Sequence, residues 1–316
     1  MTTATTSDGR TAEYDGEMRR KHWPPVPPFE PPPARTLTVD GVGELFLRDS
    51  GGSGPPVMLL HGWTASADLN WWGCYRDLQD AGYRVLAIDH RGHGRGLRTY
   101  ERFSITACAS DAAAAIEALG CPPAVVVGYS LGGAIGQVLA RNHPGVVSGL
   151  VLSGTAQHWQ DRRLRGYWRT MAPLSLALAV APRATWRLCL RYVGMRESPR
   201  TAWILAELIR HSATDIAEAG RELGRFDSRP WLSALQMPSA VVVTTNDQAV
   251  PPSKQRELAE ALRAAVFEAP IDHIEITSRP EAYNPALLKA IAFVQEASGT
   301  SGDGSVRAAA GVVGYA

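Results

Sequence analysis

The sequence predicts an α/β fold with a mostly parallel eight-stranded sheet, helices on both faces and one helical insertion. Eight short apolar runs alternate with helical patterns. Several of the runs are nearly continuously apolar, which is typical of parallel strands covered on both faces. The alternation stops once, over residues 156–237, where helical periodicity continues without a convincing strand. A chain of 316 residues, 45% hydrophobic and 20% charged, is long enough to bury a large core.

The expected strands follow one another in a simple order. The first two runs, residues 36–42 and 44–50, fit an antiparallel edge hairpin. The later runs fit parallel strands at 56–62, 83–90, 124–130, 149–155, 240–247 and 264–270. The core is therefore expected over residues 35–155 and 238–296. Residues 156–237, here called the cap, should lie near the carboxyl ends of the strands, where open α/β sheets bind ligands.

Both ends of the chain are expected to lie outside the fold. Residues 1–34 are polar and then proline-rich (PPVPPFEPPP), a composition that favours extended backbone over a packed core. Residues 297–316 are rich in glycine and serine. We predict a disordered extension and a flexible tail. A docking site for a proline-binding module is the less favoured interpretation of the proline run.

A serine stands between two glycines where the fifth run gives way to a helical pattern, in the segment VVVGYSLGGAIGQVLA. A nucleophile on a sharp strand-to-helix turn has strained dihedrals and leaves no room for side chains two residues before and after it. Gly128 and Gly132 supply that room, and the following helix directs its free N–H groups toward an oxyanion. The pattern predicts Ser130 as a nucleophile.

Candidates for the base and acid follow in the chain. A serine hydroxyl needs a base, and the base needs an orienting carboxylate. Asp247 comes after the run AVVVTT, and His273 lies in the loop APIDHIEI after the next run. Each alone fits a turn acid or a solvated loop histidine, but the order Ser, Asp, His favours a catalytic triad.

An oxyanion hole is expected beside the serine. The backbone N–H of Leu131 supplies one donor, and the segment MLLHGWTAS suggests the N–H of Trp63 as the second. His61 is interpreted as bracing this loop in preference to direct catalysis. Trp63 and Tyr129, beside the nucleophile, are expected to contact an apolar substrate.

These motifs resemble the α/β-hydrolase superfamily, and the likeness covers roughly residues 35–295. The segments HGW, DHRGHGRG, GYSLGG, NDQAVP and IDH match, in order, the oxyanion loop, a post-strand loop, the nucleophile elbow, the acid loop and the histidine loop. The resemblance implies the roles of nucleophile, acid, base and oxyanion donors for Ser130, Asp247, His273 and the amides of Trp63 and Leu131.

The resemblance also bears on two alternatives. His90 and His93 suggest a metal site, but the loop that holds them is architectural in the family, so no metal and no cofactor are expected. Many relatives have glycine before the catalytic histidine, whereas this chain has Asp272. That carboxylate either raises the basicity of His273 or faces solvent, and the second interpretation is favoured.

The identity of the nucleophile limits the reactions that are expected. Epoxide hydrolases and haloalkane dehalogenases of this fold use an aspartate at the elbow, so Ser130 favours acyl transfer. We expect a hydrolase that cleaves a carboxylic ester, thioester or lactone of a small to medium apolar substrate through an acyl-enzyme. A carbon–carbon bond hydrolase and a cofactor-free perhydrolase remain alternatives. A receptor that retains the fold without catalysis is the alternative from another class.

Composition restricts the partners. The formal charge of +1 gives no reason to expect nucleic acid. Four scattered cysteines and an N-terminus without a signal-like apolar core favour a cytoplasmic protein. The cap mixes arginine with apolar residues at helical spacing, which fits packed helices with a solvated basic face. The alternative is transient contact with a lipid surface or an anionic substrate tail, without stable membrane insertion. The oligomeric state stays open.

Overall fold

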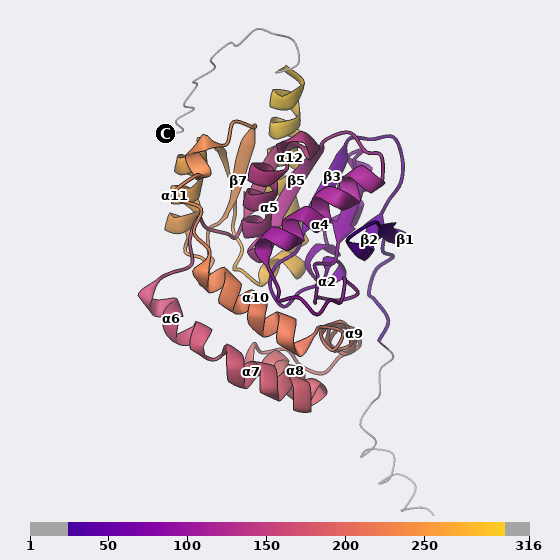
Figure 1. The fold of residues 1–316 in the computed structure, drawn as a ribbon, viewed down its shortest axis with the longest axis vertical. Coiled ribbons are helices and arrows are strands. Elements are labelled where there is room, and N and C mark those ends of the chain that lie inside the picture. Colours follow the sequence, from indigo (N-terminus) through magenta and orange to yellow (C-terminus); the bar gives the residue numbers. More distant parts are fainter. Residues whose placement is uncertain (1–24, 301–316) are drawn as a thin grey trace, which may run out of the picture.

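The computed structural model describes residues 25–300, with only the backbone for residues 162–165 and 300. One eight-stranded sheet runs through the molecule in the order β1-β2-β4-β3-β5-β6-β7-β8, and helices cover both faces (Figure 1). Only the pairs β1–β2 and β2–β4 are antiparallel. The predicted fold class is confirmed. The strands are β1 (Ala34–Val39), β2 (Gly43–Asp49), β3 (Pro56–Leu60), β4 (Arg84–Ile88), β5 (Ala124–Tyr129), β6 (Val147–Ser153), β7 (Ser239–Thr244) and β8 (Ala265–Ala269).

Alternate residues of each central strand enter different cores. In β3, Met58 and Leu60 pack in the cluster that contains α4 (Ile105–Ala118), α5 (Leu131–Asn142) and α11 (Pro252–Leu262). Val57 and Leu59 pack in the cluster on the opposite face, with α2 (Ala67–Trp71), α3 (Tyr75–Asp80) and α12 (Pro280–Thr300). Side chains alternate along a strand, so burial on both faces requires a continuous apolar run.

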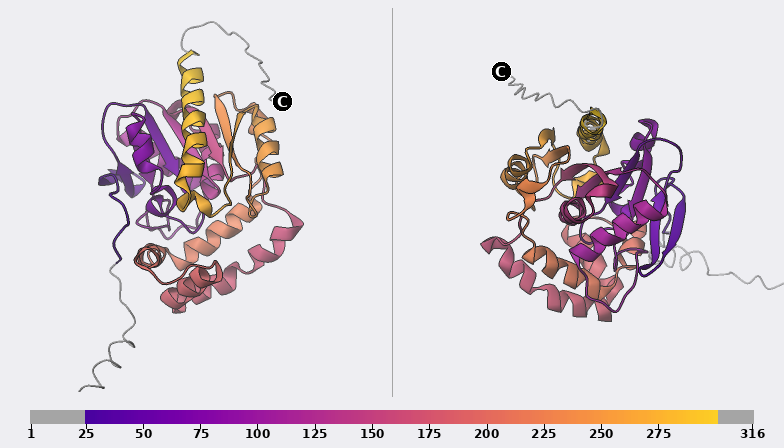
Figure 2. Two further views of the ribbon diagram at one scale, coloured as in Figure 1. Left: turned by 180° about the vertical axis from the view of Figure 1, so that it is seen from behind. Right: turned by 45° about the horizontal axis from the view of Figure 1, so that its top comes forward.

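The helices between β6 and β7 form a separate layer beside the sheet (Figures 1 and 2). They are α6 (Arg162–Arg169), α7 (Met171–Val180), α8 (Pro182–Tyr192), α9 (Pro199–Leu208) and α10 (Ala213–Arg225). Arg95, from the loop after β4, donates two hydrogen bonds of 2.9 and 2.6 Å to the Glu207 carboxylate of α9. Glu207 is buried, so this paired charge holds the layer in place.

The segment before β1 packs against the fold. The Phe29 ring lies 5.6 to 6.0 Å from the rings of Trp72, Tyr75 and Trp203, and so contacts both the core and α9. Pro32 is buried. The expected disordered extension over residues 1–34 is corrected for Phe29 and Pro32, which pack against the fold, and for Ala34, at which β1 begins. Residues 1–24 lie outside the described residues.

The chain also remains helical beyond the expected end of the core. Helix α12 continues to Thr300, and the Ser298 hydroxyl donates to the Ser148 carbonyl oxygen at 2.7 Å. The flexible tail predicted from residue 297 is corrected for residues 297–300, because this contact ties the last helical turn to β6. Residues 301–316 lie outside the described part of the chain. Each helix within residues 25–300 is either too short or too polar to span a lipid bilayer.

Candidate active site

Ser130 lies in the turn between β5 and α5 with a left-handed backbone (φ 54°, ψ −114°). A Cβ atom on Gly128 would lie 2.4 Å from the carbonyl oxygen of Gly132, and one on Gly132 would lie 2.0 Å from that of Leu60. Both distances are far below van der Waals contact, so only glycine fits at these two positions. The two glycines permit the strained turn on which the serine is held.

Three loops bring the predicted polar residues into one hydrogen-bonded series. His273 Nε2 lies 3.1 Å from Ser130 Oγ, and His273 Nδ1 lies 2.7 Å from Asp247 Oδ2. The serine follows β5, the aspartate follows β7 and the histidine follows β8. Because these strands are parallel neighbours or near neighbours, their carboxyl ends meet at one edge of the sheet.

The Asp247 carboxylate is buried and has a fixed orientation. Its Oδ1 accepts the backbone N–H groups of Ala249 and Val250 at 2.9 and 2.7 Å, and its Oδ2 accepts the Thr244 hydroxyl at 2.8 Å. The buried Gln255 side chain in turn donates to Thr244 Oγ1 at 2.7 Å. Sequence reasoning missed Thr244 and Gln255, since no local pattern shows that a helix glutamine reaches back to the end of β7.

Asp272 contacts backbone rather than the imidazole. Its Oδ1 accepts the N–H of Gln248 at 3.1 Å and the N–H of His273 at 2.5 Å. Gln248 follows directly after Asp247, so the Asp272 carboxylate joins the acid loop to the histidine loop. Neither interpretation of this residue from the sequence included such a bridge.

Tyr129 does not line a substrate pocket. Its hydroxyl donates to the carbonyl oxygen of His273 at 2.6 Å, and its ring lies among Trp71, Tyr283 and the histidine ring with 2% of its surface exposed. The expectation that Tyr129 binds substrate is corrected. Successive side chains of β5 point to opposite faces of the sheet, and that of Tyr129 lies in the core on the α12 face, where it supports the histidine loop.

The loop after β3 lies beside the serine. A Cβ atom on Gly62 would be 3.4 Å from Ser130 Cβ, and the Gly62 N–H donates to Asn70 Oδ1 at 2.9 Å. Within residues 25–300, no acceptor takes the backbone N–H of Trp63 or of Leu131. These two amides are therefore free to bind a ligand oxygen.

The Trp63 side chain connects this loop to the helices of the cap. Its indole N–H donates to the carbonyl oxygen of Ile216 in α10 at 2.8 Å, and its ring packs edge-on against Tyr167 and Trp168 of α6. Trp63, Tyr167 and Trp168 thus form an aromatic cluster that joins the loop beside Ser130 to α6. The sequence pointed to Trp63 but not to its partners.

Three buried histidines, His61, His90 and His93, pack together behind this loop, and the partly buried His211 packs against His93. His61 Nδ1 donates to the Gly62 carbonyl oxygen at 2.9 Å, while its Nε2 accepts the N–H of His90 at 3.0 Å, so His61 braces the loop. Burial lowers the pKa of His90 and of His211 to about 3, and lowers those of His61 and His93 well below the usual value. In the described residues, no group of three or more His, Cys, Asp or Glu is arranged to hold a metal.

Because these histidines have lowered pKa values, we expect the free energy of unfolding to fall as the pH is lowered below about 6.5. The unfolded chain takes up protons at them below about pH 6.5, whereas folded His90 and His211 do so only near pH 3. Each should lower the free energy of unfolding by up to about 1.4 kcal/mol per pH unit below 6.5. Burial raises the pKa of Asp89 to about 6, which offsets part of this loss because the folded protein gains that proton first.

Urea unfolding at pH 7, 6 and 5 measures the effect. The control is His211→Asn, which removes one titrating group and should give a shallower fall with pH. Equal unfolding free energies at pH 7 and 5 would contradict the prediction.

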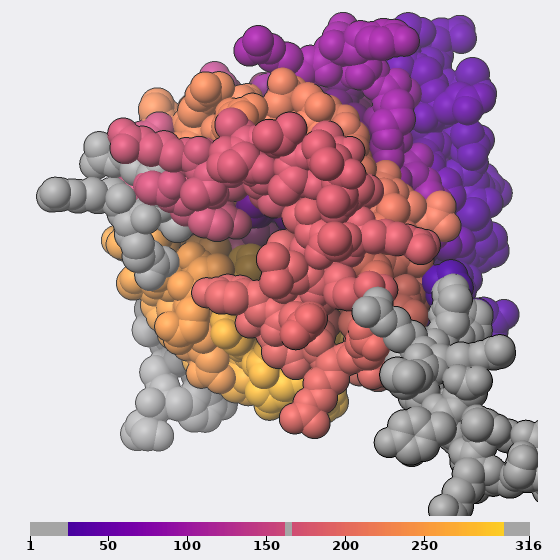
Figure 3. All heavy atoms as spheres, turned by 90° about the horizontal axis from the view of Figure 1, so that it is seen from below, coloured from indigo at the N-terminus to yellow at the C-terminus, as the bar shows by residue number. Residues whose placement is uncertain are grey.

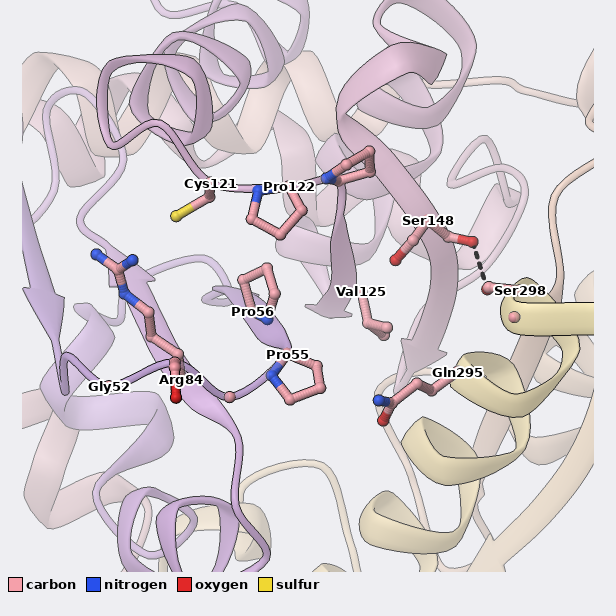
Figure 4. A pocket seen from close by; sticks show the side chains of 14 residues that line it. Gly52, Pro55, Pro56, Arg84, Cys121, Pro122, Val125, Ser148, Gln295 and Ser298 are labelled. Carbon is pink, nitrogen blue, oxygen red and sulfur yellow. Dashed lines mark hydrogen bonds between the residues drawn. The ribbon is translucent and has the colours of Figure 1, made fainter. Parts of the chain in front are cut away.

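A cavity of about 540 Å³ lies at the other end of the sheet (Figure 4). It is lined by residues at the amino ends of the parallel strands, including Pro56, Arg84, Val125 and Ser148. The Arg84 guanidinium is paired with Asp49 at 2.8 Å. This cavity lies away from Ser130, which follows the carboxyl end of β5, and so it is not part of the candidate active site.

Comparisons with known proteins identify the family to which this fold belongs. A family model described as the alpha/beta hydrolase fold matches residues 55–187. The non-heme chloroperoxidase of Streptomyces lividans is 30% identical over 283 residues, which cover 82% of this chain and 99% of that protein. The chain belongs to the α/β hydrolase family.

Two further similarities are more limited. The non-heme haloperoxidase of Rhodococcus erythropolis is 41% identical over 119 residues, but these cover only 37% of this chain and 43% of that protein. The structure of an esterase from Exiguobacterium antarcticum matches with a TM-score of 0.71 at 21% identity, covering 82% of this chain and 100% of that one. This second similarity establishes the fold alone.

Proposed function

We propose that the protein is a serine hydrolase that cleaves a carboxylic ester, thioester or lactone of a small to medium apolar substrate. The observation that carries the proposal is the series Ser130–His273–Asp247, with distances of 3.1 and 2.7 Å, at a strained strand-to-helix turn. Membership of the α/β hydrolase family supports hydrolysis in general. The assignment to esters rests on Ser130. A serine hydroxyl that is activated by a base can attack a carbonyl carbon, and two unpaired backbone N–H groups beside it can stabilise the oxyanion that forms.

In the acylation step, Ser130 Oγ attacks the substrate carbonyl carbon while its proton passes to His273 Nε2. Asp247 holds the Nδ1 proton and so keeps Nε2 free to accept. The negative charge that develops on the carbonyl oxygen is stabilised by the N–H groups of Trp63 and Leu131. The bond to the leaving oxygen or sulfur then breaks, and the leaving group takes the proton from Nε2.

In the deacylation step, His273 accepts a proton from water, and the resulting hydroxide attacks the acyl carbon. The same two amides stabilise the second oxyanion. Breakdown returns the proton to Ser130 Oγ and releases the carboxylic acid. No residue other than the triad needs to change its protonation state.

A fluorophosphonate probe and an ester panel test the proposal together. The probe should label the wild-type protein and not Ser130→Ala, and the wild type should turn over at least one ester or thioester many times. Labelling without turnover on any member of the panel would instead support a receptor that retains the fold. Absence of labelling in a folded protein would contradict the assigned nucleophile.

A second candidate is perhydrolysis, which is favoured by the peroxidase names of the two curated relatives. In this reaction hydrogen peroxide replaces water in deacylation, so the acyl-enzyme yields a peroxyacid and free Ser130. Adding peroxide to an ester assay and measuring oxidation of bromide by the peroxyacid separates the two outcomes. A perhydrolase forms peroxyacid in competition with the carboxylic acid, whereas a strict esterase forms only the acid.

The acyl group is expected to bind against the aromatic cluster of Trp63, Tyr167 and Trp168. Each methylene buried there should contribute about 0.8 kcal/mol, or roughly a fourfold rise in kcat/KM, until the pocket is full. We therefore expect kcat/KM to rise from p-nitrophenyl acetate to the hexanoate. The matched control is Trp63→Ala, which should flatten the series. A wild-type series that is flat or falls with length would contradict an apolar acyl site.

A further inference from the structure

Every fully exposed side chain of α7 is apolar, and the one polar residue of the helix, Ser175, is half-buried. The exposed residues are Ala172, Pro173, Leu176, Ala177, Ala179 and Val180. Leu176 and Val180 are 66% and 77% exposed and lie one helical turn apart. A globular protein rarely leaves a whole helix face apolar unless that face meets another apolar phase.

The neighbouring helix α8 also exposes apolar side chains and adds positive charge. Leu188 and Tyr192 are 68% and 91% exposed and again lie one turn apart. Arg183, Arg187 and Arg191 form a parallel exposed stripe on the same helix. A row of arginines beside an exposed aromatic and aliphatic row is the pattern of helices that lie in a membrane interface.

The charge around this surface has one sign over a long stretch. Residues 162–196 contain eight arginines and no aspartate, glutamate or lysine, although the chain as a whole is nearly neutral at +1. The arginine stripe of α8 also borders a groove of about 270 Å³ toward α9, whose lining includes Leu190, Leu205 and also Glu197. The positive charge is therefore concentrated on the cap.

We propose that the exposed surface of α7 and α8 binds to anionic lipid bilayers. The apolar row of Leu176, Val180, Leu188 and Tyr192 would enter the boundary between headgroups and acyl chains, while the three arginines would contact lipid phosphates. Contact between two copies of this surface is disfavoured, because a symmetric interface would bring two arginine stripes together and neither α7 nor α8 contains an acidic residue to pair with them.

The surface lies on the same side of the molecule as the candidate active site. Helix α7 packs against α10 so closely that a Cβ atom on Gly220 would lie 2.5 Å from Met171 Sδ, and α10 accepts the Trp63 indole N–H through Ile216. Figure 3 shows this face hollowed between the cap helices, with atoms from the first half of the chain at the bottom of the hollow. A bilayer bound to α7 and α8 would therefore lie on the face that contains this hollow, and lipophilic esters dissolved in the bilayer would be held near it.

Sedimentation with phosphatidylcholine vesicles, with and without phosphatidylglycerol, tests the proposal. The full chain should bind the anionic vesicles at least tenfold more tightly than the neutral ones, and added salt should weaken the binding. The charge variant Arg183→Gln/Arg187→Gln/Arg191→Gln should bind the anionic vesicles about a hundredfold more weakly. The apolar variant Leu176→Ser/Val180→Ser should lose about tenfold or more.

Matched controls carry the same numbers of changes on other surfaces. They are Arg76→Gln/Arg256→Gln/Arg263→Gln and Val266→Ser/Phe293→Ser, all at exposed positions outside the cap. Both controls should bind like the wild type, and thermal melts should show that all variants are folded. Repeating the assay with Ser130→Ala separates binding from any hydrolysis of the lipids.

Three outcomes would overturn the proposal. Equal binding to neutral and anionic vesicles would exclude the role of the arginines. Equal losses of affinity for anionic vesicles in the cap variants and in their controls would show that the surface of α7 and α8 is not the binding site. The third outcome is a wild-type protein that does not bind vesicles and forms a dimer, while the Leu176→Ser/Val180→Ser variant is monomeric. This result would show that the surface mediates self-association. None of these outcomes depends on whether Ser130 is catalytic.

Discussion

Replacing Ser130 by alanine should leave the fold intact and lower kcat by about a million-fold. The hydroxyl is the only group in the proposed reaction that forms a covalent bond with the substrate. Without it no tetrahedral intermediate forms on the enzyme, so the two oxyanion donors have no negative oxygen to stabilise. The change removes a single hydrogen bond, to His273, and alanine tolerates the same backbone as serine. Ester hydrolysis by the variant, corrected for contaminating activity, measures the effect.

The chain offers a matched control for this variant. Ser110 Oγ also lies 3.1 Å from a histidine nitrogen, His143 Nε2, but this pair lies far from the β5–α5 turn. Ser110→Ala should therefore keep wild-type kcat and show a comparable change in melting temperature. Turnover by a folded Ser130→Ala protein close to that of Ser110→Ala would remove the serine from the mechanism.

Replacing Asp247 by asparagine should lower kcat by roughly ten-thousandfold. The carboxylate accepts the Nδ1 proton of His273 and so leaves Nε2 free to take the serine proton. An asparagine amide that donates to Nδ1 would favour the opposite tautomer, in which Nε2 carries the proton. The surrounding contacts to Thr244, Ala249 and Val250 hold the side chain in place, so the effect should appear mainly in kcat rather than in KM.

Asp272→Asn is the control for that change, since it also removes a carboxylate next to the histidine. Its Oδ1 accepts two backbone N–H groups, which an asparagine oxygen can still accept. We expect a loss of about tenfold or less, because its charge is partly screened by solvent. If Asp272→Asn proves more damaging than Asp247→Asn in folded protein, the acid is assigned to the wrong residue.

Much of the sheet and the turn that holds Ser130 could be predicted because their causes are local. A continuous apolar run requires cover on both faces, and the glycines at 128 and 132 are demanded by backbone atoms a few residues away or on the neighbouring strand. The glycine-framed turn, the positions after strands and the order along the chain together selected Ser130, Asp247 and His273. The tertiary structure brings these three residues within hydrogen-bond distance. Their catalytic roles remain the subject of the variants above.

Other features depend on contacts between segments far apart in the chain, which no local pattern encodes. Tyr129 follows an apolar run and precedes the serine, yet whether its ring faces substrate or core was decided by the space beneath the histidine loop. Phe29 lies in a proline-rich stretch, but rings from α9 and the core bind it. Gln255 supports the acid only because α11 packs against the end of β7. The sequence by itself determined the fold class and which polar groups follow which strands. The tertiary structure alone decided which side chains support them, because burial depends on the surfaces that meet after folding.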